Sequence, residues 1–380
     1  MTTIAADTPL PMPGDEPAHV LSEVRGQLGC ITLSRPKALN ALSLDMIRAL
    51  TQRLLAWRDD AQIKAVAIRG SSKTGPFGAF CAGGDIRFFH QAALAGDPAL
   101  EDFFTEEYAL NHLIHSYPKP FIAFMDGIVM GGGMGLAQGA QIRVVTERTR
   151  MAMPETNIGL FPDVGGGYFL SRCPGHSGEW LALTGDTLGA AAALALGLAD
   201  HCFDASRLPL AWNALALLDF DQQSAVDAWL VDFEMTCFGD FSETANQIDH
   251  YFGLDCVPAM VRALEASDDA WALRCAATLR RRSPLMLQVT LEQIRRARAL
   301  SLADELRMER DMVHHCFDPR HLGRSASQSE TVEGIRALAV DKDNTPHWHP
   351  SRIEDVTCEM VAPFFSSPWT PQTHPLRALV

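Results

Sequence analysis

The chain has 380 residues, of which 47% are hydrophobic and 21% charged, so its composition supports a sizeable core and excludes a wholly disordered chain. Its 32 Lys and Arg against 46 Asp and Glu give a net charge of −14, which argues against nucleic acid or an anionic membrane surface as the main partner. The longest membrane-like stretch, 188–199, is much shorter than the roughly 20 residues of a spanning helix. At roughly 150 residues per domain, the length predicts two or three domains, or one large domain with an appendage.

The beginning of the chain and its cysteines point to a cytoplasmic location. Residues 1–19 hold three acids, four prolines and no Lys or Arg, so they resemble neither a secretory signal nor a transit peptide and predict a disordered leader. The nine cysteines are scattered without a Cys-x-x-Cys pair, which favours free thiols in a reducing compartment. Adjacent side chains such as His314, His315 and Cys316 do not converge on one ion, so we expect no metal site.

Strands and helices are expected to alternate in the first half of the chain. Alternating or β-branched runs predict the strands, Ser43 is a candidate N-cap, and apolar positions at helical spacing predict the helices. The expected strands are 29–34, 63–69, 120–125 and 142–146, and the expected helices are 44–58 and 100–116. This alternation predicts an α/β core over 20–204 with parallel strands.

The second half of the chain changes character near residue 205. The helical patterns there are 211–219, 223–232, 242–252, 258–266, 268–282 and 284–316. A strand-like run reappears only at 338–340. We therefore expect a mostly helical region over 205–365, followed by a loose tail, 366–380, that contains three prolines.

Two glycine-rich segments are candidates for backbone recognition of a ligand. Phe80–Asp85 reads as a turn between a strand and a helix, which presents N–H groups but is also typical of an ordinary turn. Met130–Gly135 contains three consecutive glycines, which allow close approach of the backbone to another group. It matches neither a dinucleotide fingerprint nor a Walker loop. Two loops that each offer one N–H are what an oxyanion hole requires.

A third segment, Met153–Gly167, carries two acids, Glu155 and Asp163, each directly after a proline. One interpretation is a pair of solvated loop acids. The other is a pair of acid/base or nucleophilic groups that a stiff loop holds against the glycine donors.

These segments, in this order, resemble the crotonase (enoyl-CoA hydratase/isomerase) superfamily over about residues 28–200. The matching segments are Arg35–Leu42, Cys81–Ile86, Gly127–Leu136, Met153–Gly167, and Leu183–Asp186 leading to Gly197-Leu198. Within the superfamily the chain is most similar to the branch of 3-hydroxyisobutyryl-CoA hydrolases, over about 20–365. That narrower likeness rests on Glu106–Tyr108, Met153–Thr156, Gly159–Phe169, Glu333–Ala337, Asp341–Asp343 and Pro346-x-Trp348.

The resemblance implies a ββα spiral core in which the N–H groups of Gly84 and Gly132 hold the thioester carbonyl. Hydratases of the family use two glutamates, of which one aligns with Glu155. The other aligns with Gly135, which carries no acid, and Asp163 stands where hydratases have glycine. This departure argues against double-bond hydration and matches the hydrolase pattern.

The implied activity is hydrolysis of a short 3-hydroxyacyl-CoA, 3-hydroxyisobutyryl-CoA or 3-hydroxypropionyl-CoA, as in valine catabolism. Glu155 would attack the carbonyl or activate a water, and Asp163 would orient Glu155 or the water, or bind the substrate hydroxyl. Glu107 would recognise that hydroxyl, although it could also be a solvated helix acid. Glu107, Gly132, Glu155 and Asp163 would thus line the substrate site.

Positive charge at Arg35 and Lys37 would lie near the adenine and phosphates of CoA. No separate cofactor is implied, because CoA arrives with the substrate. A hydratase or isomerase of the same superfamily remains an alternative, and so does a non-catalytic acyl-CoA-binding protein. Family members often form trimers, so a homo-oligomer is possible unless the C-terminal region replaces those contacts.

Overall fold

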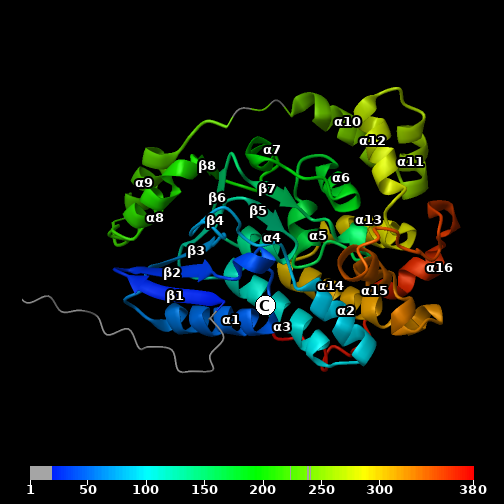
Figure 1. The fold of residues 1–380 in the computed structure, drawn as a ribbon, viewed down its shortest axis with the longest axis horizontal. Helices are drawn as coiled ribbons and strands as arrows, with labels where there is room; N and C mark the ends of the chain where they lie inside the picture. Colours follow the sequence, from blue (N-terminus) through cyan, green and yellow to red (C-terminus); the bar gives the residue numbers. More distant parts are fainter. Residues whose placement is uncertain (1–18, 223, 238, 240) are drawn as a thin grey trace, which may run out of the picture.

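The computed structural model of the protein describes residues 19–222, 224–237, 239 and 241–380 (Figure 1). The expected disordered leader, 1–19, lies outside the described residues except for its last position. The strands are β1 (Val20–Arg25), β2 (Leu28–Leu33), β3 (Ala65–Gly70), β4 (Phe121–Met125), β5 (Ile128–Met130), β6 (Ile142–Thr146), β7 (Arg150–Ala152) and β8 (His201–Phe203). None of the helices in these described ranges is both long and apolar enough to cross a bilayer.

The strands form a six-stranded sheet in the order β1-β2-β3-β4-β6-β8 and a separate two-stranded sheet of β5 and β7. Strands β1 and β2 pair antiparallel as a hairpin, and all the other pairs are parallel. The predicted α/β core with parallel strands is therefore confirmed, and each expected strand lies within two residues of an observed one.

The helices of the first 195 residues are α1 (Leu44–Asp59), α2 (Ile86–Ala95), α3 (Ala99–His115), α4 (Gly132–Gln138), α5 (Gly166–Leu170), α6 (Ser177–Thr184) and α7 (Ala190–Ala195). Helix α1 begins where the sequence predicts, because the Ser43 hydroxyl accepts a hydrogen bond from the Met46 N–H at 3.4 Å. Its buried residues recur at helical spacing and face the sheet.

Both faces of the large sheet are covered, as its nearly continuous apolar strands require. In β3 the side chains alternate: Val66 and Ile68 belong to the main core, whereas Ala65 and Ala67 face a smaller cluster around Trp212. The main core includes residues of α1, α3 and the C-terminal helices, and α8 and α9 cover the other face (Figure 1).

The C-terminal half is helical, as expected, and its main helices pack on the core rather than apart from it. These helices are α8 (Leu208–Leu215), α9 (Ala225–Phe233), α10 (Ser242–Phe252), α11 (Val257–Glu265), α12 (Ala270–Leu279), α13 (Pro284–Ala297), α14 (Leu302–Phe317), α15 (Glu330–Ile335) and α16 (Cys358–Val361). Helix α13 packs against α5 and α6, and α14 packs against α3. One continuous hydrophobic cluster therefore spans the predicted boundary at residue 204.

Two local predictions in this half are wrong. The expected helix 284–316 is two helices, because α13 ends at Ala297 and the Ser301 hydroxyl caps a new helix by accepting from the Asp304 N–H at 3.2 Å. The strand-like run 338–340 lies in a π-helical turn, η6 (Arg336–Val340), that continues α15. Three apolar residues in a row carry no period that separates a strand from a helix.

Two predictions made from composition also differ from the structure. The expected loose tail packs on α14: Leu376 is buried, and His374 lies 3.3 Å from the Asp311 carboxylate. Cys202 and Cys237, expected to be free thiols, are joined in a disulfide. The chain after α9 returns alongside β8, where the Met235 N–H donates to the Cys202 carbonyl at 2.8 Å, and this proximity is invisible in the sequence spacing.

Candidate active site

Five residues that the sequence singles out line one cavity of about 170 Å³. They are Gly84, Glu107, Gly132, Glu155 and Asp163. The cavity lies among the loop before α2, the start of α4, the buried face of α3 and the segment 154–164. These five residues, spread over about 80 positions of the chain, thus contribute to a single site.

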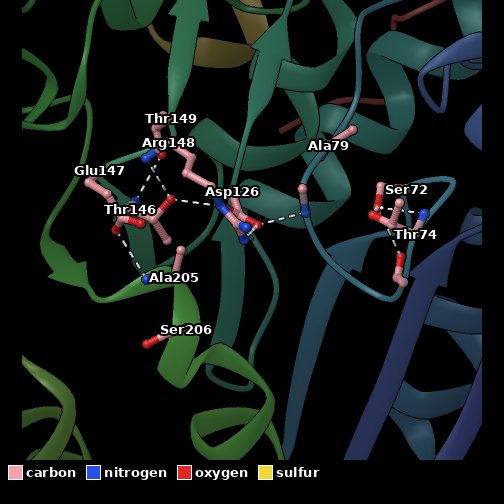
Figure 2. Close-up of polar contacts among 12 residues, drawn as sticks. Ser72, Thr74, Ala79, Asp126, Thr146, Glu147, Arg148, Thr149, Ala205 and Ser206 are labelled. Atoms are coloured by element: carbon pink, nitrogen blue, oxygen red, sulfur yellow. Dashed lines mark hydrogen bonds and ion pairs between the residues drawn. The ribbon is translucent and has the colours of Figure 1, made fainter.

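A buried carboxylate anchors the loop that leads to Gly84. Asp126, directly after β4, accepts hydrogen bonds from the Gly78 N–H at 2.6 Å and from the Thr146 hydroxyl at 2.7 Å. Arg148 pairs with the same carboxylate, as Figure 2 shows. Gly127 follows with a φ of +73°, and a Cβ there would stand 2.2 Å from the Gly78 carbonyl oxygen. Only glycine fits at this position, so the Asp-Gly pair fixes the loop against the sheet.

The two candidate N–H donors lie at adjoining backbone segments. Gly132 is the first residue of α4, so its N–H has no partner within the helix. In the described chain, neither that N–H nor the Gly84 N–H donates to another backbone group. A Cβ at the neighbouring Gly83 would lie 3.6 Å from the Gly132 nitrogen. Gly83 and Gly131 have φ values of +108° and +49°, a conformation that glycine permits and that brings the segments together.

Glu155 begins a short 3-10 turn, η2 (Glu155–Ile158), directly after Pro154. Its side chain is only 7% exposed, and its Oε2 atom receives no hydrogen bond from any described residue. The other oxygen points to the glycine triplet, because a Cβ at Gly131 would lie 2.8 Å from Oε1. Glu155 is therefore a buried carboxylate beside the candidate donors rather than a solvated loop acid.

Asp163 is buried as well, and a tyrosine fixes its orientation. The Tyr108 hydroxyl donates a hydrogen bond of 2.9 Å to the Asp163 Oδ2 atom. Tyr108 comes from α3 and is itself fully buried. The interpretation of Asp163 as a solvated loop acid is therefore wrong.

Glu107 precedes Tyr108 on α3, and its carboxylate reaches the glycine triplet. A Cβ at Gly132 would stand 2.5 Å from the Glu107 Oε1 atom, and no described residue donates a hydrogen bond to that oxygen. The side chain is 2% exposed, so Glu107 is not a solvated helix acid, unlike its neighbour Glu106, which pairs with Arg48 at the surface.

Three carboxyl groups share this cavity, and burial disfavours the ionised form of each. Burial raises the pKa of Glu155 well above its usual range, and the charge of Asp163 adds to the effect. Burial, with the charges of Asp163 and Glu155, does the same to the pKa of Glu107. Burial raises the pKa of Asp163 to about 7, although the hydrogen bond from Tyr108 opposes the shift. Asp163 therefore titrates near neutral pH, where general bases are effective, and the pKa values of Glu155 and Glu107 are shifted in the same direction.

The raised pKa of Asp163 predicts how stability depends on pH. Its pKa is 3.8 in the unfolded chain and about 7 in the folded protein, so its stabilising contribution is complete below pH 4 and is lost as the pH rises towards 7. That contribution is up to about 4 kcal/mol, at about 1.4 kcal/mol per pKa unit. Between pH 5 and pH 8, the melting temperature of wild type should fall by a few degrees more than that of Asp163→Asn, which cannot ionise. Parallel melting curves would contradict the assignment, and Asp45→Asn, at an exposed position, is the control.

Arg35 and Lys37, the predicted phosphate-binding residues, do not line the cavity. Arg35 forms an ion pair of 2.8 Å with Asp85 and donates to the Ala41 carbonyl at 3.0 Å. Asp85 follows Gly84 and caps α2, so Arg35 holds the loop that carries a candidate donor. Lys37 is exposed in the short turn Pro36–Ala38, and a contact between either residue and CoA stays a prediction.

Two members of the site, Tyr108 and Leu338, are not among the site residues predicted from the sequence. Tyr108 stands within the quoted Glu106–Tyr108 motif, but nothing in the sequence connects it to Asp163. Leu338, from η6 of the C-terminal region, also lines the cavity. The quoted Glu333–Ala337 motif ends one residue before it, which is the signal that could have identified it.

Comparison with known proteins supports the resemblance. The enoyl-CoA hydratase/isomerase family model matches residues 28–365. A mitochondrial 3-hydroxyisobutyryl-CoA hydrolase of Danio rerio is 39% identical over 92% of this chain and 90% of its own length, and that of Homo sapiens is 36% identical over 93% and 90%.

Two solved structures share the fold over nearly their whole length. One, titled a carnitinyl-CoA dehydratase from Mycobacterium thermoresistibile, has a TM-score of 0.84 at 38% identity and covers 93% of this chain and 97% of its own. The other, an enoyl-CoA hydratase from Rhodobacter sphaeroides, has a TM-score of 0.82 at 34% identity, with coverages of 92% and 98%. The predicted crotonase-like core with a helical C-terminal region is thereby confirmed, and the chain belongs to the enoyl-CoA hydratase/isomerase family.

Proposed function

We propose that this protein hydrolyses the thioester of a short 3-hydroxyacyl-CoA, either 3-hydroxyisobutyryl-CoA or 3-hydroxypropionyl-CoA, to the free acid and CoA. The observation that carries the proposal is the convergence of two acids, Glu155 and Asp163, with two unengaged N–H groups, those of Gly84 and Gly132, in one cavity. The relatives named 3-hydroxyisobutyryl-CoA hydrolase, which match about nine tenths of the chain, support it.

In the proposed reaction the two N–H groups stabilise the negative charge that develops on the carbonyl oxygen under attack. By one route Glu155 takes a proton from water, whose oxygen attacks the carbonyl carbon. By the other, the Glu155 carboxylate attacks that carbon itself to form a mixed anhydride, which water then hydrolyses. In both routes the carbon–sulfur bond breaks and the thiolate of CoA acquires a proton. By the first route the acyl group gains the water oxygen. By the second, water attacks the Glu155 carboxyl carbon of the anhydride, so the acyl group keeps the Glu155 oxygen and the water oxygen enters the Glu155 carboxylate.

The remaining carboxyl groups are suited to orientation and recognition. Asp163, which Tyr108 holds in place, would orient Glu155 or the water, or accept from the substrate hydroxyl. Glu107 would also accept from that hydroxyl. The buried Oε1 atom of Glu107 receives no hydrogen bond from the described protein. An acyl chain that lacks the hydroxyl would leave this oxygen unpaired, so Glu107 would select against such chains.

Hydration of a double bond is the second candidate, because two similar solved structures carry the titles of a hydratase and a dehydratase. The position of the second hydratase glutamate is Gly135 here. A Cβ at that position would lie 2.6 Å from the Val164 Cβ and 2.9 Å from the Asn111 amide nitrogen. Val164 and Asn111 therefore occupy the space that a glutamate would need, which favours hydrolysis.

A panel of short acyl-CoA thioesters, with and without a 3-hydroxyl group, tests the proposal. We expect free thiol to be released fastest from the 3-hydroxyacyl substrates, as followed with a chromogenic disulfide. Crotonyl-CoA should show little loss of enoyl absorbance. Enoyl loss without thiol release would support a hydratase, and binding without turnover of any substrate would support a non-catalytic acyl-CoA-binding protein.

Three further properties are part of this proposal: a role in valine catabolism, a cytoplasmic location and a homo-oligomeric state. A preference for the 3-hydroxyisobutyryl group, if the panel finds it, would support a role in valine catabolism. A cytoplasmic location stays a prediction, because the disulfide between Cys202 and Cys237 removes the argument from free thiols and the names of the relatives describe those proteins as mitochondrial. A homo-oligomer is the third, and sedimentation of the purified protein tests it.

A further inference from the structure

Helix α14 buries two acids outside the catalytic cavity. Glu305 and Glu309 lie one turn apart, and neither side chain is exposed to solvent. The other charged residues of this helix, such as Asp304 and Arg310, have partners of opposite charge. No Lys, Arg or His of the described chain forms an ion pair with Glu305 or Glu309, so the two acids need another explanation.

Glu309 binds the backbone that directly follows Asp163. The Gly165 N–H donates to its Oε2 atom at 2.8 Å, and the Gly167 N–H donates to Oε1 at 3.1 Å. The amide nitrogen of Gln293, from α13, donates to the same Oε1 at 3.0 Å and to the Pro162 carbonyl at 2.7 Å. The C-terminal helices thus tie the backbone on both sides of Asp163.

The segment they bind has a conformation that needs support. Val164, a β-branched residue, has a φ of +57°, which costs on the order of 1–3 kcal/mol and persists only where neighbours enforce it. Gly165 follows at +85°. The segment also lies tight against the acids, since a Cβ at Gly167 would stand 2.2 Å from the Glu305 Oε1 atom.

The two acids should share a proton, because no basic residue of the described chain forms an ion pair with either of them and two adjacent buried negative charges are costly. Burial raises the pKa of Glu305 to about 7, and burial raises the pKa of Glu309 as well. Three N–H groups donate to Glu309, which favours its ionised form. Both amide hydrogens of Gln293 are already engaged, and Glu305 receives no hydrogen bond in the described chain. Glu305 is therefore suited to hold the proton.

We propose that Glu309 is a positioning residue for the reaction: as a carboxylate it fixes the segment that presents Asp163, with Glu305 as its protonated neighbour. This inference rests on the proposed role of Asp163. It also gives the C-terminal region a catalytic purpose, since α13 and α14 hold a residue of the N-terminal core in its working orientation.

The charge of Glu309 adds to those that surround Asp163. The titratable groups near Asp163 are Glu107 and Tyr108 from α3, Glu155 from η2, and Glu305, Glu309 and Cys316 from α14. Loss of one negative charge from this set makes ionisation of the remaining acids easier. Substitution of Glu309 by glutamine should therefore move the acid limb of the kcat profile to lower pH.

The test compares three Glu→Gln variants with wild type. In Glu309→Gln the new amide NH2 group faces an N–H donor and cannot accept its hydrogen bond, so the segment around Asp163 should shift. A misplacement of Asp163 by about 1 Å should lower kcat by 10- to 100-fold and leave KM within about threefold of wild type. Glu305→Gln should stay within about threefold of wild type, because an amide can donate where the protonated acid donates. Glu292→Gln, which only breaks a surface pair with Arg296, is the matched control. If Glu309→Gln does not fold, Gln293→Met removes one hydrogen bond to Glu309 and the hydrogen bond to the Pro162 carbonyl.

Amide hydrogen exchange of the peptide spanning 162–168 gives a readout that does not depend on activity. Exchange there should accelerate in Glu309→Gln and stay as in wild type in Glu292→Gln. The proposal is overturned if Glu309→Gln keeps wild-type kcat, pH profile and exchange, or if Glu305→Gln is the more damaging change. Failure of the proposed function would look different. Wild type would then release no thiol, but amide exchange of 162–168 would still be faster in Glu309→Gln than in wild type.

Discussion

Glu155→Gln should lower kcat for 3-hydroxyisobutyryl-CoA by about 10³-fold, in the middle of the usual range of about 10²- to 10⁴-fold for loss of a general base. The side chain is buried beside the glycine donors, and its Oε2 atom has no hydrogen bond from the described protein. Glutamine has nearly the same shape and no negative charge. Affinity for CoA, measured by calorimetry, should change by less than about threefold.

Wild-type turnover in the Glu155→Gln variant would contradict the assignment. Glu106→Gln is the matched control, since Glu106 is a neighbour in sequence of a site residue but pairs with Arg48 at the surface. Repeated turnover in heavy-oxygen water separates the two routes. Mass spectrometry should find label in the Glu155 carboxylate if it forms the mixed anhydride, and no label there if Glu155 only activates water.

Gly132→Ala should lower kcat/KM by about 10²- to 10³-fold, the usual cost of an impaired oxyanion-hole donor. The new methyl carbon would stand 2.5 Å from the Glu107 Oε1 atom and 3.3 Å from the Leu42 Cδ1 atom. The start of α4 must shift to relieve these contacts, and the Gly132 N–H moves with it. The variant should retain the circular dichroism spectrum of wild type, because α4 needs no positive φ at this position.

Gly189→Ala is the control for Gly132→Ala. Gly189 also precedes a helix, but a Cβ there would meet only the Arg150 guanidinium, at 4.0 Å. We expect this variant to hydrolyse the substrate at the wild-type rate. Equal activity of the two glycine variants would show that the Gly132 N–H does not stabilise the transition state.

Local sequence patterns predicted the core elements because those elements depend on local chemistry. Ser43 caps α1 through its own hydroxyl, and the β-branched run at 63–69 forms β3, with apolar side chains on both faces as a buried parallel strand requires. Where the pattern was short, it failed: 338–340 is part of a π-helical turn. The break between α13 and α14 also escaped, although Ser301 was available as a cap signal.

The candidate site could be predicted only in part. Residues of the glycine-rich and Pro-Glu/Pro-Asp segments were found because their types and order are specific. The burial of these residues and their hydrogen-bond partners could not be predicted, because they depend on contacts between distant segments. The Tyr108 hydroxyl, for example, donates to Asp163, 55 positions further along the chain. The supporting acid Glu309 lies more than 140 residues beyond the loop that it binds. In the sequence it is simply one of several charged residues on a helix.

The sequence by itself determined the α/β core, the crotonase-like motifs and the absence of an acid at position 135. Each of these is written in residue types and short spacings. Only the tertiary structure decided that Glu107, Glu155 and Asp163 share one buried cavity, that Arg35 braces a loop, and that side chains of α13 and α14 bind the segment around Asp163. The physical reason is that pKa values and hydrogen-bond partners depend on desolvation and on contacts between distant segments, which exist only once the chain has folded.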